Sequence, residues 1–143
     1  MEHGKLVAAV TVVGEADAPR YVQKIHAGRH ELPADEHAAL GGADAGPNPF
    51  AYLLSGLGAC TSITLRMYAE RKGWRLGTVT VGLKLLREET GIRIERDVAV
   101  GGELDDDQRA RLADICERTP VTLALKSGIE IRTALKASGA RSP

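Results

Sequence analysis

The stretch that decides the fold is GPNPFAYLLSGLGACTSITLRMYAERKGW, residues 46–74. Asn48 is a capping residue, Pro49 suits the first helical position, and Gly73 favours the left-handed conformation that ends a helix. No proline lies between the last two, so the stretch predicts one helix of about 36 Å over residues 49–72. Residues 50–65 carry no charge, and a helix that is apolar on every side is expected to be buried on every side.

Two glycines and a cysteine lie inside this predicted helix. Gly56 and Gly58 each cost about 1 kcal/mol relative to alanine, so we expect another part of the structure to approach the helix closely there. Cys60 follows in the middle of the uncharged segment. Free cysteine is commonly buried as a small hydrophobic residue. The neighbouring residues alone therefore leave two interpretations of Cys60, a core residue and a reactive thiol.

The segments before this helix predict strands and a long loop. Residues 5–13 are rich in β-branched side chains and predict a first strand. Residues 20–26 and 29–33 predict a hairpin around a short turn. Residues 34–49 contain glycines, prolines and aspartates, which favour a loop, and a loop of this length in a compact domain is usually functional.

After the helix, hydrophobic alternation is clearest in residues 78–87 and 91–101, which predict a β-hairpin. A second helix is predicted over residues 105–118, with Asp105 as its cap and Gln108 completing a capping box. The remaining expectations are a short helix over residues 120–127, capped by Thr119 and closed by Gly128, and a last strand over residues 129–135.

This order of elements indicates an α+β fold, because antiparallel strands are mixed with helices. The length corresponds to one domain, residues 1–143, with a core of its own. Aromatic residues make up only 3% of the chain, so aliphatic side chains must build that core. A small aliphatic core of this kind favours extension across a dimer interface.

The composition argues against several classes of partner. The chain has 19 basic and 19 acidic residues and zero formal net charge, which argues against nucleic-acid binding. No segment has the length and apolarity of a membrane span, and the N-terminal residues do not resemble a signal peptide. Two distant cysteines without an export signal indicate the cytoplasm. The histidines lack metal-ligand spacing, so neither a metal nor a cofactor is expected.

Three segments resemble one known family. They are the helix stretch, the loop ADEHAALGGADAGPNP at residues 34–49 and the segment GELDDDQRARLADICERTPVTLAL at residues 102–125. The family they resemble is the OsmC/Ohr family of osmotically inducible and organic hydroperoxide resistance proteins, and the resemblance is strongest to its OsmC-like branch. It extends over about residues 21–135. It implies an intertwined homodimer in which a long, buried central helix of each chain packs against antiparallel sheets.

The resemblance also implies cysteine-based peroxidase chemistry of the peroxiredoxin type. In active members a helix cysteine attacks an organic hydroperoxide and becomes a sulfenic acid. A second cysteine then closes a disulfide, which a dithiol such as a lipoylated protein reduces. Cys60 falls on the position of the attacking cysteine. The nucleophile must be a thiolate, and the pKa of a free cysteine, about 8.5, falls beside a cation or a helix N-terminus.

Three positions depart from the pattern of the active members. Thr119 stands where the family has its second cysteine, and we expect it to keep the helix-capping role of that position. Phe50, followed by Ala51, stands where active members carry a carboxylate. In active members an arginine pairs with this carboxylate and stabilises the thiolate. Its position falls near Ala38 in this chain, where no arginine is present. The resemblance therefore implies an incomplete catalytic set.

Three other side chains could complete the set. Cys116 precedes the position of the second cysteine by three residues, so it is a candidate resolving thiol; the alternative is a core residue in line with Leu112 and Ile115. His37 in the long loop could reach the reactive cysteine as a replacement cation or base, and Asp35 could reach the same place. The alternative for His37 is an ordinary surface position.

We expect an apolar pocket beside Cys60 at the dimer interface, with walls formed by Phe50, Leu57 and Thr61. Apolar walls favour apolar substrates, so the pocket is expected to prefer bulky or lipid-like peroxides over hydrogen peroxide.

Two hypotheses from different classes follow. In the first, the chain is a cytoplasmic homodimeric redox protein that reduces organic hydroperoxides through Cys60. Cys116, an external thiol or no group at all then resolves the sulfenic acid. In the second, the chain is a non-catalytic homodimer whose pocket holds a small lipophilic ligand. Whether the chain is an enzyme stays open at this point, and the pH dependence of thiol alkylation separates the two hypotheses.

Overall fold

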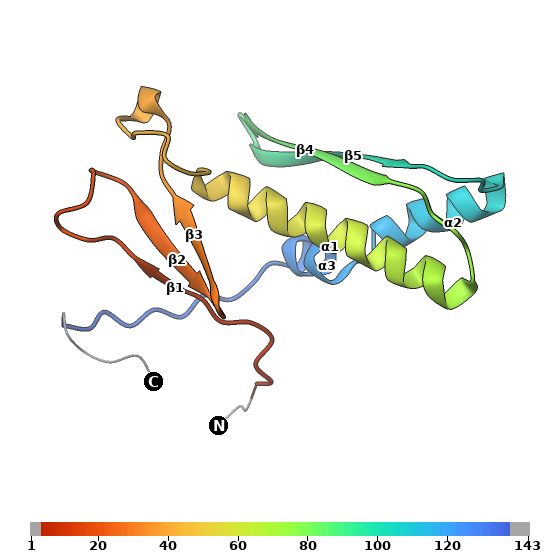
Figure 1. Ribbon diagram of the computed structural model, residues 1–143, viewed down its shortest axis with the longest axis horizontal. Helices are drawn as coiled ribbons and strands as arrows, with labels where there is room; N and C mark the ends of the chain where they lie inside the picture. The colour runs from red at the N-terminus through yellow and green to blue at the C-terminus, as the bar shows by residue number, and fades with distance from the viewer. Residues whose placement is uncertain (1–3, 138–143) are drawn as a thin grey trace. The chain divides into compact units, whose positions relative to one another are not determined.

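The computed structural model describes residues 4–137, and Figure 1 shows its elements in chain order. Helices are mixed with antiparallel strands, which confirms the predicted α+β fold class. The elements are β1 Thr11–Val13, β2 Gln23–Ala27, β3 His30–Ala34, the 3-10 helix η1 Ala38–Leu40, α1 Pro49–Lys72, β4 Val79–Glu88, β5 Gly91–Val100, α2 Asp106–Cys116 and α3 Pro120–Ser127.

The described residues divide into two compact units. One contains residues 4–59 and 80–99, and the other contains residues 60–79 and 100–137. The boundary falls inside α1, so this helix contributes its first half to one unit and its second half to the other. That the whole chain forms one domain stays a prediction.

The first unit contains a three-stranded antiparallel sheet in which β2 is the central strand. Ile25 of β2 pairs with Val12 of β1 and with Leu32 of β3. Gly28 makes the turn between β2 and β3 with a φ of 60°, a conformation that glycine adopts without strain. The predicted hairpin is therefore confirmed. The predicted first strand is too long, because β1 begins only at Thr11.

The hairpin of β4 and β5 forms the second sheet. Exposure alternates along β4, as expected for a strand with one side against other residues. The covered side of β4 lies close to α1, because a β-carbon added at Gly58 would lie 2.8 Å from Cδ1 of Leu83. The close approach expected at Gly58 is therefore present. At Gly56 a β-carbon would meet nothing within 4 Å, so the same expectation is wrong there for a single chain.

Helix α1 begins and ends where the sequence predicts. The side-chain Oδ1 of Asn48 accepts a hydrogen bond from the amide of Ala51 at 2.8 Å, which caps the first turn. At the other end Gly73 has a φ of 72°, and the amide of Trp74 donates to the carbonyl of Ala69 at 2.8 Å. These contacts close the last turn in the manner of a left-handed helix end.

The two long faces of α1 differ in exposure. What we call the covered face is buried from Leu57 to Ala69, with Leu65 0% exposed; its residues are Leu57, Thr61, Leu65 and Ala69. What we call the uncovered face consists of Leu53, Gly56, Cys60, Ile63 and Met67. Its large apolar side chains lie in solvent, and Ile63 is 55% and Met67 58% exposed. The expectation that α1 is buried on every side is therefore wrong for one chain.

Helices α2 and α3 belong to the second unit. The carboxylate of Asp105 accepts from the amide of Gln108 at 2.8 Å, and the Gln108 side chain accepts from the amide of Asp105 at 2.9 Å, so the predicted capping box is confirmed. The helix buries Leu112, Ile115 and Cys116. Helix α3 begins at Pro120 and ends at Gly128, which has a φ of 80°.

The predicted last strand is wrong. Residues 129–135 form no strand in the described part of the chain. Their apolar side chains lie in solvent, and Ile131 is 84% exposed. An alternating segment becomes a strand only when a neighbour pairs with its backbone, and no described segment of the chain pairs with this one.

Candidate functional site

Cys60 lies in the middle of α1, half-buried, on the uncovered face, two turns after Leu53 and two turns before Met67. One helical turn away are Leu57 on the covered face and Ile63 on the uncovered face. The Sγ atom of Cys60 lies 3.8 Å from Oγ1 of Thr64, one turn further along the helix. Cys60 and Cys116 are both free thiols.

Thr64 is a site residue that the sequence analysis missed. It could have been found, because a residue four positions after Cys60 in a predicted helix lies on the same side of that helix. A hydroxyl at this position can donate to a thiol or a thiolate. The spacing Cys60–Thr64 is therefore the signal that was available in the sequence.

The predicted pocket walls lie in different surroundings. Leu57 and Thr61 are buried, so the packing of the chain itself already covers them. Phe50 is exposed in the first turn of α1, and the helical rise between it and Cys60 is about 15 Å. The side chains of Phe50 and Cys60 therefore do not touch within one chain, whereas Leu57 and Thr61 lie beside Cys60 on the helix.

His37 is tied into the loop that precedes α1. Its Nε2 lies 2.8 Å from Nδ2 of Asn48, and Oδ1 of Asn48 is engaged by the amide of Ala51. Nδ2 is therefore the donor, and Nε2 of His37 must be an unprotonated acceptor. The other ring nitrogen, Nδ1, lies 4.0 Å from the carboxylate of Asp44. His37 therefore connects the loop to the start of α1.

Asp35 organises the same loop from inside. Its side chain is buried, and its two carboxylate oxygens accept from the amides of Glu36 at 2.7 Å and of Ala43 and Ala45 at 3.0 Å each. The hydrogen bond from Ala45, with those from Glu36 and Ala43, holds the pKa of Asp35 below its ordinary value despite burial. All three bonds remain within the loop, so Asp35 has a structural task there.

Cys116 and Thr119 lie in a buried region at the end of α2. Thr119 is 0% exposed, and its Oγ1 lies 2.6 Å from Oγ1 of Thr122. Thr122 donates in turn to the carbonyl of Cys116 at 3.4 Å. Thr119 occupies the N-cap position of α3, but its side chain makes no capping bond. The expected capping role is therefore wrong for the hydroxyl, which pairs with Thr122 instead.

The C-terminal end of α1 carries an aromatic and cationic cluster. The Tyr68 hydroxyl accepts from Nε of Arg111 at 2.9 Å, and this bond lowers the pKa of Tyr68. Trp74 contacts the Tyr68 ring edge to face at 5.6 Å, and Nζ of Lys72 lies 5.7 Å from the same ring. These contacts fasten α1 to α2 and to the segment that follows α1.

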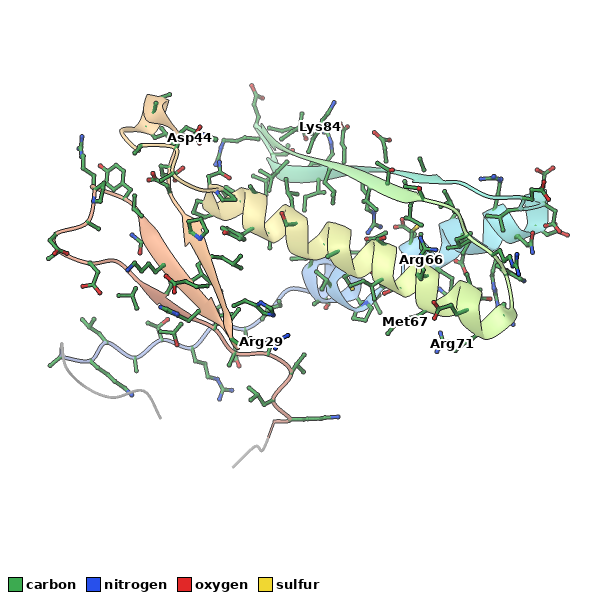
Figure 2. All side chains as sticks on the ribbon, viewed as in Figure 1. Arg29, Asp44, Arg66, Met67, Arg71 and Lys84 are labelled. Atoms are coloured by element: carbon green, nitrogen blue, oxygen red, sulfur yellow. The ribbon has the colours of Figure 1, made fainter. Side chains whose placement is uncertain are left out.

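An open hollow lies beside the same end of α1, lined by Met67, Glu70 and Arg71. Met67 and Arg71 project from the same side of the helix in Figure 2. Met67 lies about 10 Å beyond Cys60 along the helix, so this hollow is separate from the thiol.

Between residues 4 and 137, no three histidine, cysteine, aspartate or glutamate side chains gather where they could hold a metal ion. Over the same residues, no helix combines the length and the apolarity that crossing a membrane requires.

A family described as "OsmC-like protein" matches residues 41–134, the greater part of the chain. This match includes α1 with Cys60 and the segment with Cys116 and Thr119. No curated protein matches the chain.

Solved structures of the same family have a similar fold. An OsmC-like protein from Mycoplasma pneumoniae is 19% identical with a TM-score of 0.72, covering 86% of this chain and 89% of that one. An organic hydroperoxide resistance protein OsmC from Legionella pneumophila is 19% identical with a TM-score of 0.62, covering 87% and 92%. OhrB of Bacillus subtilis is 21% identical with a TM-score of 0.60, covering 92% and 98%. The predicted OsmC-like fold is confirmed.

Proposed function

Because the chain belongs to the OsmC-like protein family, we propose that it is a thiol-dependent redox protein that reduces organic hydroperoxides through Cys60. The observation that carries this proposal is the position of Cys60, half-buried on the apolar face of α1 that the chain leaves uncovered. A thiol at such a place is accessible and has apolar surroundings for an organic substrate. Two similar structures are of organic hydroperoxide resistance proteins, which supports the substrate class.

The proposed reaction begins with the thiolate of Cys60. Sulfur attacks one peroxide oxygen, the O–O bond breaks, the alcohol leaves with a proton, and Cys60 becomes a sulfenic acid. A second thiol then condenses with the sulfenic acid, a disulfide forms and water leaves. Thr119 cannot be that thiol, because it has a hydroxyl where the family resemblance implies a cysteine. We propose Cys116, or one thiol of an external dithiol such as a lipoylated protein, for this step. In either case the external dithiol supplies the two electrons that reduce the disulfide and restore Cys60.

We further propose that the working form is a homodimer in which a second copy covers the uncovered face of α1. Leu53, Ile63 and Met67 expose apolar side chains along this face. Exposed apolar side chains that gather on one face mark interaction sites. In such a dimer Phe50 of the second copy would be available as a pocket wall, which it is not within one chain.

A second candidate function is a non-catalytic homodimer that binds a small lipophilic ligand. One observation favours it. Within residues 4–137 the hydrogen-bond partner of Cys60 Sγ is the neutral hydroxyl of Thr64, and a reactive cysteine is ordinarily activated by a cation, a metal or a helix N-terminus. In this function Cys60 is a passive wall of the ligand site.

A single-turnover titration with cumene hydroperoxide, followed by intact mass and peptide mapping, tests the proposed enzyme. A gain of about 16 Da on Cys60, or a loss of about 2 Da with a Cys60–Cys116 crosslink, supports it. The crosslink would identify Cys116 as the resolving thiol, and the gain would indicate an external one. Cys60→Ser is the control and should show neither change. An unchanged mass of the native chain at stoichiometric peroxide would overturn the proposal and favour the binding function.

A further inference from the structure

The hydroxyl of Thr64 has an unusual hydrogen-bond partner for a helical residue. Oγ1 lies 3.8 Å from Sγ of Cys60, one turn earlier in α1. Serine and threonine inside helices ordinarily donate to the carbonyl four residues earlier. Ser55 does so in α1, to Ala51 at 2.7 Å, and Ser127 does so in α3, to Leu123 at 2.7 Å.

The two possible charge states of Cys60 use this contact differently. When the thiol is protonated, either atom can be the donor across the contact. A thiolate has no proton and can only accept, so the Thr64 hydroxyl must then be the donor. A hydrogen bond that exists as a charge-assisted bond in the ionised state favours that state.

Charged side chains do not compete for this contact. Among residues 4–137, neither Sγ of Cys60 nor Oγ1 of Thr64 is hydrogen-bonded to a charged group. Arg66 is the first charged residue after them in α1. Its guanidinium donates to the carbonyls of Leu76 at 3.2 Å and Gly77 at 2.9 Å, so it is occupied elsewhere.

We propose that Thr64 is the positioning residue that stabilises the thiolate of Cys60 by donating its hydroxyl hydrogen to Sγ. The inference rests on the proposed function, in which this thiolate is the nucleophile. A neutral donor one turn away from Cys60 then takes part of the task for which the family resemblance implies an arginine.

The test is the rate of iodoacetamide alkylation of Cys60 as a function of pH, followed by peptide mapping on the full chain. Thr64→Val removes the hydroxyl with little change of shape. It is expected to slow alkylation near pH 7 by about three- to tenfold, the factor that one hydrogen bond of ordinary strength contributes. The midpoint of the profile should move upward by about half a unit to one unit. The plateau at high pH, where all of the thiol is ionised, should not change.

Two variants keep this test falsifiable. Thr64→Ser keeps the hydroxyl and should restore the native profile, and Ser62→Ala removes a hydroxyl from a neighbouring position and should leave it unchanged. Superimposable profiles for Thr64→Val and the native chain would overturn the inference. So would a Thr64→Val profile whose plateau falls by the same factor, because that change would reflect access to Cys60 alone. Alkylation needs no peroxide, so failure of the peroxide titration would overturn the enzyme while these profiles still test Thr64.

Discussion

The covered and uncovered faces of α1 have similar apolar side chains and opposite surroundings. Leu65 on one face is completely shielded, while Ile63, two residues away, is 55% exposed. Both faces are built from the same uncharged stretch of sequence, so composition does not distinguish them. The comparison shows that the chain covers one side of this helix and leaves the apolar side chains of the other side exposed.

The largest expected effect belongs to the covered face. Leu65→Ala should lower the free energy of unfolding by about 2–5 kcal/mol, because it removes a fully buried side chain and leaves a cavity. Urea unfolding followed by circular dichroism measures this change. Glu70→Ala, at an exposed position of the same helix, should change it by less than about 0.5 kcal/mol. Equal effects of the two variants would show that Leu65 is not a core residue.

A charge on the uncovered face tests the proposed dimer. Ile63→Lys should weaken association by about a hundredfold or more, because it places an unpaired ammonium in an apolar interface. Analytical ultracentrifugation should show a dimer for the native chain and a monomer for the variant, with the helical circular dichroism signal retained. Glu89→Lys adds the same side chain at an exposed position of the turn between β4 and β5, away from α1, and should remain dimeric. A monomeric native chain, or a dimeric Ile63→Lys variant, would contradict the dimer.

The two glycines of α1 give the smallest and most discriminating comparison. Gly58→Ala directs a methyl group at Leu83, and the crowding should exceed the gain in helix propensity, with a net loss of up to about 2 kcal/mol. Gly56→Ala meets nothing within 4 Å and should gain up to about 1 kcal/mol. Urea unfolding of both variants measures the difference. A loss at Gly56 as large as that at Gly58 would mean that a second copy approaches the backbone there.

Local signals predicted the helices well because their evidence lies within a few residues. Asn48 and Pro49 mark the start of α1 and Gly73 marks its end, as the structure shows. Asp105 and Gln108 form their capping box within one turn. In each case the interaction that fixes the boundary joins residues three to five positions apart, so the sequence contains all of it.

Strands were harder to predict because their evidence is not local. Residues 5–10 belong to a stretch rich in β-branched side chains and residues 129–135 alternate like a strand, yet neither segment pairs with a described part of the chain. β-branched and apolar residues suit a strand, but backbone pairing decides whether it forms. The hairpin of β4 and β5 was predicted correctly because a short turn brings its partner strands together.

The candidate site was predictable as a position and not as a set of contacts. Cys60 could be singled out from its place in the uncharged helix and from the family resemblance. The hydrogen bonds that retain His37 in its loop join it to Asn48, eleven residues away in sequence, and no spacing rule connects these two. Sequence reasoning therefore gave His37 a possible task at the thiol, whereas the structure places its ring nitrogens within the loop.

The buried carboxylate of Asp35 has a practical consequence for anyone who wishes to label this protein. Its bonds to Ala43 and Ala45 fix the number of residues in a loop that looks long and permissive by its glycines. A peptide tag inserted between residues 36 and 43 would have to displace those bonds. The short turn at Gly28, where a β-carbon would meet nothing within 4 Å, asks only for a residue that tolerates a φ of 60° and is the better place for an insertion.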